Sequence, residues 1–451
     1  MASSKKPQPN ELVEHVAGFV ARHIPAGGRV AVGLSGGLDS IVLFDLLVSL
    51  ATAHDLALSA LHVNHGISRN AARWAEFCAA LCERHGVPCQ VAVLQVQAGP
   101  GESLEAAARD ARYAEYARLS ANCIALAHHA DDQAETLLLQ LLRGAGVKGL
   151  SAMPEARAFA GKTLLRPLLD FTRAELEAYA CEHSLQWIED ESNADTSYDR
   201  NFLRHEVLPL LARRYPAYRT TLGRAARHFA ETAQLLDQLA ALDAGDAVHD
   251  PSRLPLAALR ALDVPRAGNL LRYFLAQHDA PMPPAARLAE ALHQLRNAAH
   301  DAQVCIEVDD HELHRHGDAI YLVKKMAPFS DDIHWQGEER LELPHGTLLM
   351  QRTTGAGLSL ARLDAPVTLR VRAGGEKLRP DCKRPRRTLK NLLQEHQVLP
   401  WQRDTLPLLF CGDTLAWAAG IGSDCAFAAQ AGEAAVLPQW QPCTPTPGAV
   451  R

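Results

Sequence analysis

Apolar and polar positions follow two alternating patterns over the N-terminal third of the chain. From Arg29 to about Val147, short apolar runs of strand length are each followed by a longer stretch with helix-like apolar spacing. The predicted strands are Arg29–Leu34, Leu56–Val63, Pro88–Leu94 and Cys123–Ala127. The predicted helices are Ile41–Thr52, Ala71–His85, Ser103–Ser120 and Asp131–Arg143. This alternation is typical of βαβ units with right-handed crossovers, so we expect an α/β domain on a doubly wound parallel sheet.

The remainder of the chain changes pattern twice. Ala/Leu-rich stretches predict a mainly helical domain over about 218–300, closed by short strands at Cys305–Val308 and Ala319–Val323. The last unit begins with an alternating strand at Val367–Arg372 and continues with a helix-like Thr388–His396. Two apolar runs separated by Cys411-Gly412-Asp413 then read as a hairpin of a small α+β domain. The expected parts are a leader and first helix (1–27), the α/β domain (28–217), a mainly helical domain (218–326), a connecting segment (327–365), a basic domain (366–436) and a frayed, Pro-rich tail (437–451).

Composition narrows the class of protein. A chain of 451 residues is expected to form two or three domains, and 47% hydrophobic with 22% charged residues is typical of soluble globular proteins. No apolar run reaches the roughly 18 residues of a membrane span. The lysines Lys5 and Lys6 precede no apolar region, so the first ten residues read as a disordered leader rather than a signal peptide. Ten scattered cysteines without a C-x-x-C pair indicate reduced thiols and a cytoplasmic location.

The turn after the first strand is the strongest candidate for a ligand site. It contains two glycines and small hydroxyls, and it opens a helix whose free N–H groups favour a phosphate. It is not a kinase-type P-loop, because it lacks the lysine of G-x-x-x-x-G-K-[ST]. It resembles the S-G-G-x-D-S loop of the N-type ATP pyrophosphatases, which hold the β- and γ-phosphates of ATP. The ATP-binding residues implied are Ser35, Gly36, Gly37, Leu38, Asp39 and Ser40.

Asp39 has a further expected role in this loop. Mg²⁺ prefers one or two carboxylates together with phosphate oxygens, so Asp39 is the candidate Mg²⁺ ligand. The competing interpretation of the whole stretch is an ordinary strand–turn–helix corner that is rich in glycine and serine.

A second motif, H-H-A-D-D-Q-A-E-T, follows the fourth strand at 128–136. Asp132 and Glu135 are three residues apart and share a helix face, where paired carboxylates could bind an ammonium group or Mg²⁺. His128 could hydrogen-bond a phosphate. Carboxylates in a first helical turn also complement the helix dipole, so capping alone is the alternative. The spacing does not match a zinc site.

Two further segments carry arginines that suit either a site or a solvated surface. Arg109 and Arg112 recur at helical spacing with Tyr113, which fits charge-assisted bonds to a phosphate or ordinary ion pairs on an exposed face. Asp190–Arg204 is an Asx-rich turn that leads into a helix, and it fits either a segment that orders on ligand binding or a plain capped loop.

A compact basic cluster near the C-terminus stands out against a net charge of −6. Only Glu376 and Asp381 oppose it nearby in the sequence, and Trp401 follows closely. A solvated face is the usual explanation of such a run, but the cluster suits a nucleic-acid backbone better. Its members are Arg370, Arg372, Lys377, Arg379, Lys383, Arg384, Arg386, Arg387 and Lys390.

In their order along the chain, these motifs resemble the bacterial tRNA(Ile)-lysidine synthetases with two C-terminal domains. The resemblance spans about 29–436. The matching stretches are S-G-G-L-D-S (35–40), H-V-N-H-G (62–66), A-R-D-A-R-Y (108–113), H-H-A-D-D-Q-A-E-T (128–136), R-G-A-G-V-K-G-L (143–150), R-P-L-L (166–169), D-E-S-N-A-D-T-S-Y-D-R-N-F-L-R (190–204), L-K-N-L-L-Q-E-H (389–396), P-W-Q-R-D (400–404) and L-P-L-L (406–409).

The resemblance implies an ATP-dependent ligation of free L-lysine to the wobble cytidine of a CAU-anticodon tRNA(Ile). The cytosine C2 oxygen is adenylated, and the lysine ε-amino group then displaces AMP. The catalytic residues implied are Asp39, Arg112, His128, Asp132 and Glu135. Asp132 and Glu135 would bind the amino groups of lysine, and Arg112 and His128 would neutralise negative charge. The oligomeric state stays open, a homodimer included.

Three other functions compete with this one. A tRNA thiolase would keep the adenylation, but its chemistry usually needs a catalytic or cluster-binding cysteine near the loop. A synthetase for a small metabolite would not need the basic cluster. An ATP-binding RNA chaperone would not need acidic and basic groups at successive strand ends. Release of pyrophosphate separates the enzymes from the chaperone.

Overall fold

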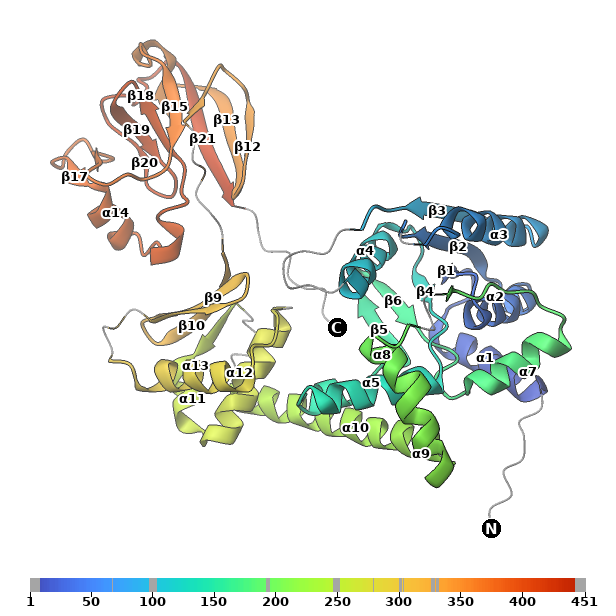
Figure 1. Cartoon of the computed structure of the whole chain (residues 1–451). Coiled ribbons are helices and arrows are strands. Elements are labelled where there is room, and N and C mark those ends of the chain that lie inside the picture. Colours follow the sequence, from blue (N-terminus) through green and yellow to red (C-terminus); the bar gives the residue numbers. More distant parts are fainter. Residues whose placement is uncertain are drawn as a thin grey trace. The chain divides into compact units, whose positions relative to one another are not determined.

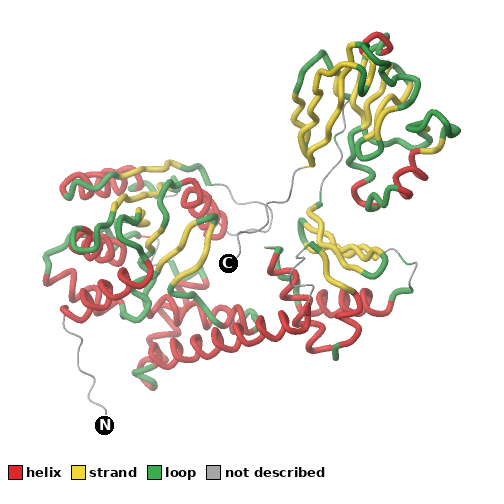
Figure 2. Tube along the Cα trace, turned by 180° about the vertical axis from the view of Figure 1, so that it is seen from behind, coloured by secondary structure: helices red, strands yellow, loops and turns green. Residues whose placement is uncertain are grey.

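The computed structural model describes residues 9–442 apart from 67, 97–103, 192–194, 246–251, 279, 300–301, 303, 326–328 and 330–331 (Figures 1 and 2). The leader expected at the N-terminus lies outside the described residues. The chain divides into two compact units at Gln238. Within the described parts, no helix has both the length and the apolar character that crossing a membrane requires.

The first unit is built on a six-stranded sheet in the order β3-β2-β1-β4-β6-β5. All neighbouring pairs are parallel except β5 and β6, which form an antiparallel hairpin at one edge. The strands are β1 (Arg29–Gly33), β2 (Ala57–Asn64), β3 (Cys89–Val93), β4 (Cys123–Ala125), β5 (Ala156–Phe159) and β6 (Lys162–Leu165). The four strands that the sequence predicts are therefore confirmed, as is their parallel arrangement.

Helices cover both faces of this sheet (Figure 1). The bounds are α1 (Pro9–His23), α2 (Leu38–Ala51), α3 (Ala71–Arg84), α4 (Leu104–Arg118), α5 (Ala130–Leu142), α6 (Val147–Leu150) and α7 (Arg173–Glu182). Successive residues of β2 pack into hydrophobic cores on opposite faces of the sheet. Ala60 packs in the cluster that contains Phe44 of α2, and Leu61 packs in the cluster that contains Tyr116 of α4. A strand buried on both faces reads as a continuous apolar run, which is why these strands were visible in the sequence.

The polar segment after α7 returns to the sheet through a short series of helical pieces. They are α8 (Asp199–Phe202), a π-helical turn (Leu203–Val207), α9 (Leu208–Arg214) and the long α10 (Tyr218–Ala244). The π-helical turn follows α8 without a break, and irregular turns of this kind are often found at functional sites.

The second unit begins with three helices and a four-stranded antiparallel sheet in the order β7-β10-β9-β8. Its elements are α11 (Leu256–Ala261), α12 (Val264–Gln277), α13 (Ala285–Asn297), β7 (Arg253–Pro255), β8 (Val304–Val308), β9 (His311–His316) and β10 (Ala319–Lys324). The helices and the strands at β8 and β10 match the prediction. Strand β9 was not expected, because Leu313 is its single apolar residue and gives no periodicity.

The C-terminal part contains two larger antiparallel sheets and a small α/β extension. The sheets run β11-β15-β18-β19-β20 and β12-β13-β21-β14. Their strands are β11 (Ile333–His334), β12 (Arg340–Leu343), β13 (Gly346–Thr354), β14 (Leu358–Ser359), β15 (Val367–Arg370), β18 (Leu408–Cys411), β19 (Thr414–Ala418), β20 (Gly422–Ser423) and β21 (Ala434–Pro442). The extension consists of β16 (Lys377–Leu378), β17 (Arg387–Thr388) and α14 (Leu389–Glu395). The predicted hairpin is β18–β19, and the predicted helix is α14.

Strand β21 runs into the stretch that the proline content predicts as a frayed tail. It pairs with β13 as far as Pro442, whereas β14 covers it only at Ala435 and Val436. Beyond Val436 one side of β21 is an edge, where prolines such as Pro438 remove no ladder hydrogen bond. Composition alone misses this because it does not show which side of a strand is paired.

One cysteine pair departs from the reduced thiols that the sequence predicts. Cys382 and Cys425 form a disulfide, with Cα atoms 5.5 Å apart and a sequence separation of 43. The other cysteines that the structure describes are free. Partners this far apart leave no local spacing motif, so the sequence pattern could not reveal the pair.

Candidate active site

The Ser35–Ser40 loop joins β1 to α2 and is held by its own hydroxyls. The Ser40 hydroxyl accepts a hydrogen bond from the Gly36 N–H at 3.1 Å and donates one to the Gly37 carbonyl at 2.9 Å. The two serine hydroxyls lie 3.0 Å apart. Ser40 is buried, so its side chain shapes the loop from within.

Gly36 is needed for two separate reasons. Its φ is +89°, in the left-handed region that favours glycine. A Cβ at this position would come within 2.9 Å of Ile188 Cδ1 and 3.2 Å of Cys78 Sγ. The Ile188 N–H also donates to the Gly36 carbonyl at 2.9 Å. The segment after α7 therefore packs directly against the turn.

Asp39 stands in the first turn of α2 and faces His129, the residue that caps α5. His129 Nε2 lies 3.6 Å from Asp39 Oδ2 and 3.5 Å from Asp132 Oδ2, and its Nδ1 lies 3.7 Å from Asp131 Oδ2. Burial lowers the pKa of His129, but the carboxylates of Asp39, Asp132 and Asp131 outweigh it and raise the pKa above the usual 6.5. His129 therefore links the glycine-rich loop to the second motif.

The geometry of Asp39 fits a divalent cation. Its Oδ1 is buried and has no hydrogen-bond partner among the described residues. A buried carboxylate oxygen without a partner is costly, and Mg²⁺ together with phosphate oxygens would satisfy it. The surroundings of Asp39 thus fit Mg²⁺, and its role as the Mg²⁺ ligand stays a prediction.

Asp132 and Glu135 share a face of α5, and two arginines from the segment after α7 bind them both. Arg200 Nε lies 2.8 Å and Arg204 Nε 2.7 Å from the carboxylate of Glu135. The Nη2 atoms of the two arginines lie 3.1 Å and 3.2 Å from Asp132 Oδ1. Arg200 and Arg204 are one turn apart across α8 and the π-helical turn, which directs both at the same face.

This four-residue charge cluster, Asp132, Glu135, Arg200 and Arg204, is largely buried. Glu135 is 0% exposed. Burial opposes the charged form of Asp132, but His129, Arg200, His128 and Arg204 together lower its pKa to about 2. Arg200 and Arg204 therefore hold the carboxylates of Asp132 and Glu135 in place. Neither sequence motif alone predicted these ion pairs.

The other two predicted catalytic residues have different surroundings from those expected. Burial lowers the pKa of His128 to about 3, with Arg166, Arg200 and Arg109 adding to the effect against the pull of Asp132. His128 is thus a neutral imidazole, which can hydrogen-bond but cannot neutralise negative charge. Arg112 donates from Nε to His65 Nε2 at 3.3 Å.

His65 is a suitable acceptor for Arg112 because it is neutral. Burial lowers its pKa to about 4, and the adjacent Arg112 and His62 contribute. His65 directly follows β2, and Asp39 and His129 follow β1 and β4. The site thus lies at the carboxyl ends of parallel strands, where ligands of such sheets bind.

The sequence motifs contained three residues of this site that the prediction did not select. His129 lay beside the chosen His128, but the sequence did not show which of the two histidines faces Asp39. Arg200 and Arg204 lay in a segment that fitted a plain loop equally well. Their four-residue spacing, on a helix that also follows an acidic turn, was the available signal.

The basic cluster of the C-terminal part is more balanced in space than in sequence. Five of its members form ion pairs: Arg370 with Asp332, Arg372 with Glu376 and Asp404, Arg384 with Asp381, Arg386 with Asp424, and Arg387 with Glu395. In the fold, therefore, carboxylates other than the two that are near in the sequence also oppose the cluster. Among the described residues, no carboxylate forms an ion pair with the side-chain nitrogens of Lys377, Arg379, Lys383 or Lys390, although the backbone N–H groups of Arg379 and Lys383 donate to Asp424 and Asp381.

The fold and the loop define the class of protein, and comparisons with known proteins define the family. Residues 10–211 match the PP-loop domain family, an ATP-binding class. Residues 254–321 match the TilS substrate binding domain, and residues 367–440 match the TilS substrate C-terminal domain.

Two curated relatives span almost the whole molecule. The chain is 47% identical over 454 residues to a tRNA(Ile)-lysidine synthase from Nitrosomonas europaea, covering 98% of each. It is 39% identical over 398 residues to the same kind of enzyme from Coxiella burnetii, covering 87% of this chain and 88% of that one. The chain belongs to the tRNA(Ile)-lysidine synthase family.

A solved structure of a U34-tRNA thiolase from Methanococcus maripaludis is similar to a smaller part of the chain. It covers 49% of this chain at 19% identity with a TM-score of 0.44. A likeness at this level carries no argument about function.

Proposed function

We propose that the chain joins free L-lysine to C2 of the wobble cytidine of CAU-anticodon tRNA(Ile), with ATP converted to AMP and pyrophosphate. The product lysidine pairs with A rather than G, which changes the codon read from AUG to AUA. The observation that carries the proposal is the placement of the glycine-rich loop, Asp39, His129 and the charge cluster at one edge of the parallel sheet.

In the first step the cytosine C2 oxygen attacks the α-phosphate of ATP, and the bond to pyrophosphate breaks. The Ser35–Ser40 loop is suited to pyrophosphate because it leads into the N-terminus of α2, where backbone N–H groups favour an anion. Mg²⁺ bound at Asp39 would neutralise charge on the phosphate oxygens. His129 would keep the Asp39 carboxylate in place, and His128 would offer a neutral hydrogen bond.

In the second step the lysine ε-amino group attacks C2 and AMP leaves with the former C2 oxygen. The amide-like C2 oxygen is a poor leaving group by itself. Once it is adenylated, it departs as part of AMP, which is a better leaving group. The charge cluster offers both signs that an amino acid requires: Asp132 and Glu135 for ammonium groups, and Arg200 or Arg204 for the carboxylate. The bound lysine would then replace existing ion-pair partners within the charge cluster, so neither the carboxylates nor the arginines of the cluster would be left unpaired.

The second unit would hold the tRNA, mostly through phosphate contacts that set its position. We assign this role first to Lys377, Arg379, Lys383 and Lys390, whose side-chain nitrogens form no ion pair among the described residues. The paired arginines of the same cluster would contribute less, since each must give up a partner. We place the reaction in the cytoplasm, where ATP, lysine and tRNA meet.

The test is release of pyrophosphate from ATP with a CAU-anticodon tRNA(Ile) transcript, with and without lysine, followed by mass analysis of the wobble base. A lysine-dependent gain of mass on that cytidine, lost in Asp39→Ala, supports the proposal. Pyrophosphate release without lysine incorporation would support the adenylation step but contradict lysine as the nucleophile. No turnover with any tRNA rejects the enzyme.

A further inference from the structure

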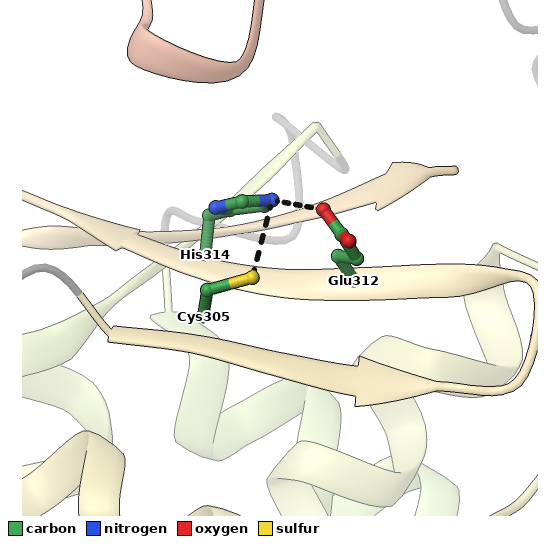
Figure 3. Close-up of side chains that lie close together, drawn as sticks. All are labelled: Cys305, Glu312 and His314. Carbon is green, nitrogen blue, oxygen red and sulfur yellow. Dashed lines mark hydrogen bonds and ion pairs between the residues drawn. The ribbon is translucent and has the colours of Figure 1, made fainter. Parts of the chain in front are cut away.

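The outer face of the sheet in the second unit carries three potential metal ligands. Cys305 of β8 stands directly opposite His314 of β9 in the antiparallel register, and Glu312 lies two residues before His314 on the same face. Their side chains point toward one another (Figure 3). The opposite face packs on the helices through Val304, Val308 and Leu313, so the three polar groups stand on the open side.

The ligand atoms already lie close together. His314 Nε2 is 2.8 Å from Glu312 Oε2 and 3.8 Å from Cys305 Sγ. All three ligand atoms lie within 4.8 Å of one another. In a tetrahedral zinc site with bonds of about 2.0 to 2.3 Å, neighbouring ligand atoms are roughly 3.3 to 3.8 Å apart. Convergence on one ion therefore needs only small side-chain rotations.

We propose that Cys305, Glu312 and His314 bind Zn²⁺. A thiolate, an imidazole nitrogen and a carboxylate oxygen are the three ligand types that Zn²⁺ uses in proteins, whereas Mg²⁺ and Ca²⁺ take oxygen ligands. Water completes the fourth position. The site is independent of the catalytic proposal, because none of its residues belongs to the first unit.

Aromatic side chains restrict the movement of the His314 imidazole. Trp401 stacks on the His314 ring with centroids 4.5 Å apart and an interplanar angle of 29°. Tyr321, opposite His314 on β10, contacts the same indole with centroids 5.1 Å apart. A ring fixed on one face loses less rotational freedom when its nitrogen binds an ion, which favours binding.

Binding displaces a proton from sulfur. Zn²⁺ binds the thiolate, and the proton passes to solvent. The ion then links strands β8 and β9 across their outer face, in addition to the ladder hydrogen bonds.

The experiment uses the full chain, freed of metal and of any histidine tag. Zn²⁺ is titrated in competition with a chromogenic chelator, and Co²⁺ is used to detect the thiolate-to-cobalt absorption band. The variants are Cys305→Ser, Glu312→Gln and His314→Gln. The matched control is Cys181→Ser, which removes another exposed free thiol, on α7 of the first unit.

We expect one Zn²⁺ per chain, with affinity at least about tenfold weaker in each of the three variants, since even indirect partners of a metal cost 10- to 100-fold. The cobalt band should be absent in Cys305→Ser and unchanged in Cys181→Ser. Zn²⁺ should also raise the unfolding midpoint of the parent and of Cys181→Ser but not of Cys305→Ser. Unchanged affinity and spectrum in Cys305→Ser, or no stoichiometric binding to the folded parent, would overturn the proposal.

Discussion

His129 Nε2 lies 3.6 Å from Asp39 Oδ2, and this contact joins two motifs that stand ninety positions apart in the sequence. The imidazole is buried, and it also lies 3.5 Å from Asp132. It therefore contacts both the carboxylate proposed to bind Mg²⁺ and one carboxylate of the charge cluster proposed to bind lysine. A change at His129 should affect both steps of the reaction.

Replacement of His129 by Gln should lower the rate of pyrophosphate release by about 10- to 100-fold, as expected for a residue that orients a metal ligand. The Mg²⁺ concentration for half-maximal rate should rise, because Asp39 loses the group that holds it. A matched His128→Gln variant should leave that Mg²⁺ dependence unchanged. Equal Mg²⁺ dependence in the parent and in His129→Gln would contradict the assigned contact.

The same variant should change how stability depends on pH. The folded state raises the pKa of His129 above 6.5, so its charge stabilises the fold fully below about pH 6.5 and less as the pH rises through the raised pKa. The free energy of unfolding should therefore differ more between parent and His129→Gln at pH 6 than at pH 9. Urea unfolding at the two pH values measures this, and a larger difference at pH 9 would show that the charged imidazole is not the stabilising form.

Replacement of Glu135 by Gln should destabilise the first unit by about 3 kcal/mol, since it leaves two guanidinium groups without their nearest carboxylate. The value is at the low end for buried pairs, because Arg200 and Arg204 keep some contact with solvent. A double-mutant cycle with Arg204→Met separates the pairwise energy from the cost of burial. The expected coupling exceeds about 1 kcal/mol, and additive effects would show that the pair contributes nothing beyond its separate groups.

Lys383→Ala should weaken tRNA binding and reduce the slope of log affinity against log salt by about one, as for the loss of one phosphate contact. Arg384 is the matched control. It belongs to the same turn, but its side chain forms an ion pair, with Nε 3.4 Å from Asp381 Oδ2. Arg384→Ala should change the slope less. Filter binding at several salt concentrations gives both slopes, and a larger change for Arg384 would reverse the ranking proposed for the basic cluster.

Reduction of the Cys382–Cys425 disulfide should lower the stability of the C-terminal part by about 2 to 4 kcal/mol, the usual contribution of such a bond. The unfolding midpoint should fall in dithiothreitol for the parent but not for Cys382→Ser. Alkylation under denaturing conditions should label two fewer cysteines before reduction than after it. Equal labelling before and after reduction would show that the bond does not form in the purified chain.

The sequence predicted the parallel sheet closely because strands buried on both faces are continuously apolar, as with Val30 to Val32 in β1. Strand β9 escaped prediction for the opposite reason. Glu312, His314 and His316 form its outer face, and on the inner face His311 and Arg315 flank the single buried leucine, so neither face has an apolar signature.

The site was predicted as far as local spacing could take it. Asp132 and Glu135 are close in sequence, so their shared helix face followed from helical periodicity. Their partners Arg200 and Arg204 stand more than sixty positions away, and only the tertiary fold decides that contact. The same holds for the carboxylates that pair with the C-terminal arginines, such as Asp332 and Asp424.

The contact between Gly36 and Ile188 also sets an order of events during synthesis of the chain. The whole S-G-G-L-D-S motif leaves the ribosome early, together with the strand and helix on either side of it. Ile188, whose N–H binds the Gly36 carbonyl at 2.9 Å, emerges about 150 residues later. A nascent chain therefore carries the complete motif long before the residue whose N–H binds the Gly36 carbonyl, and the packing around the turn is completed only when most of the first unit has been made.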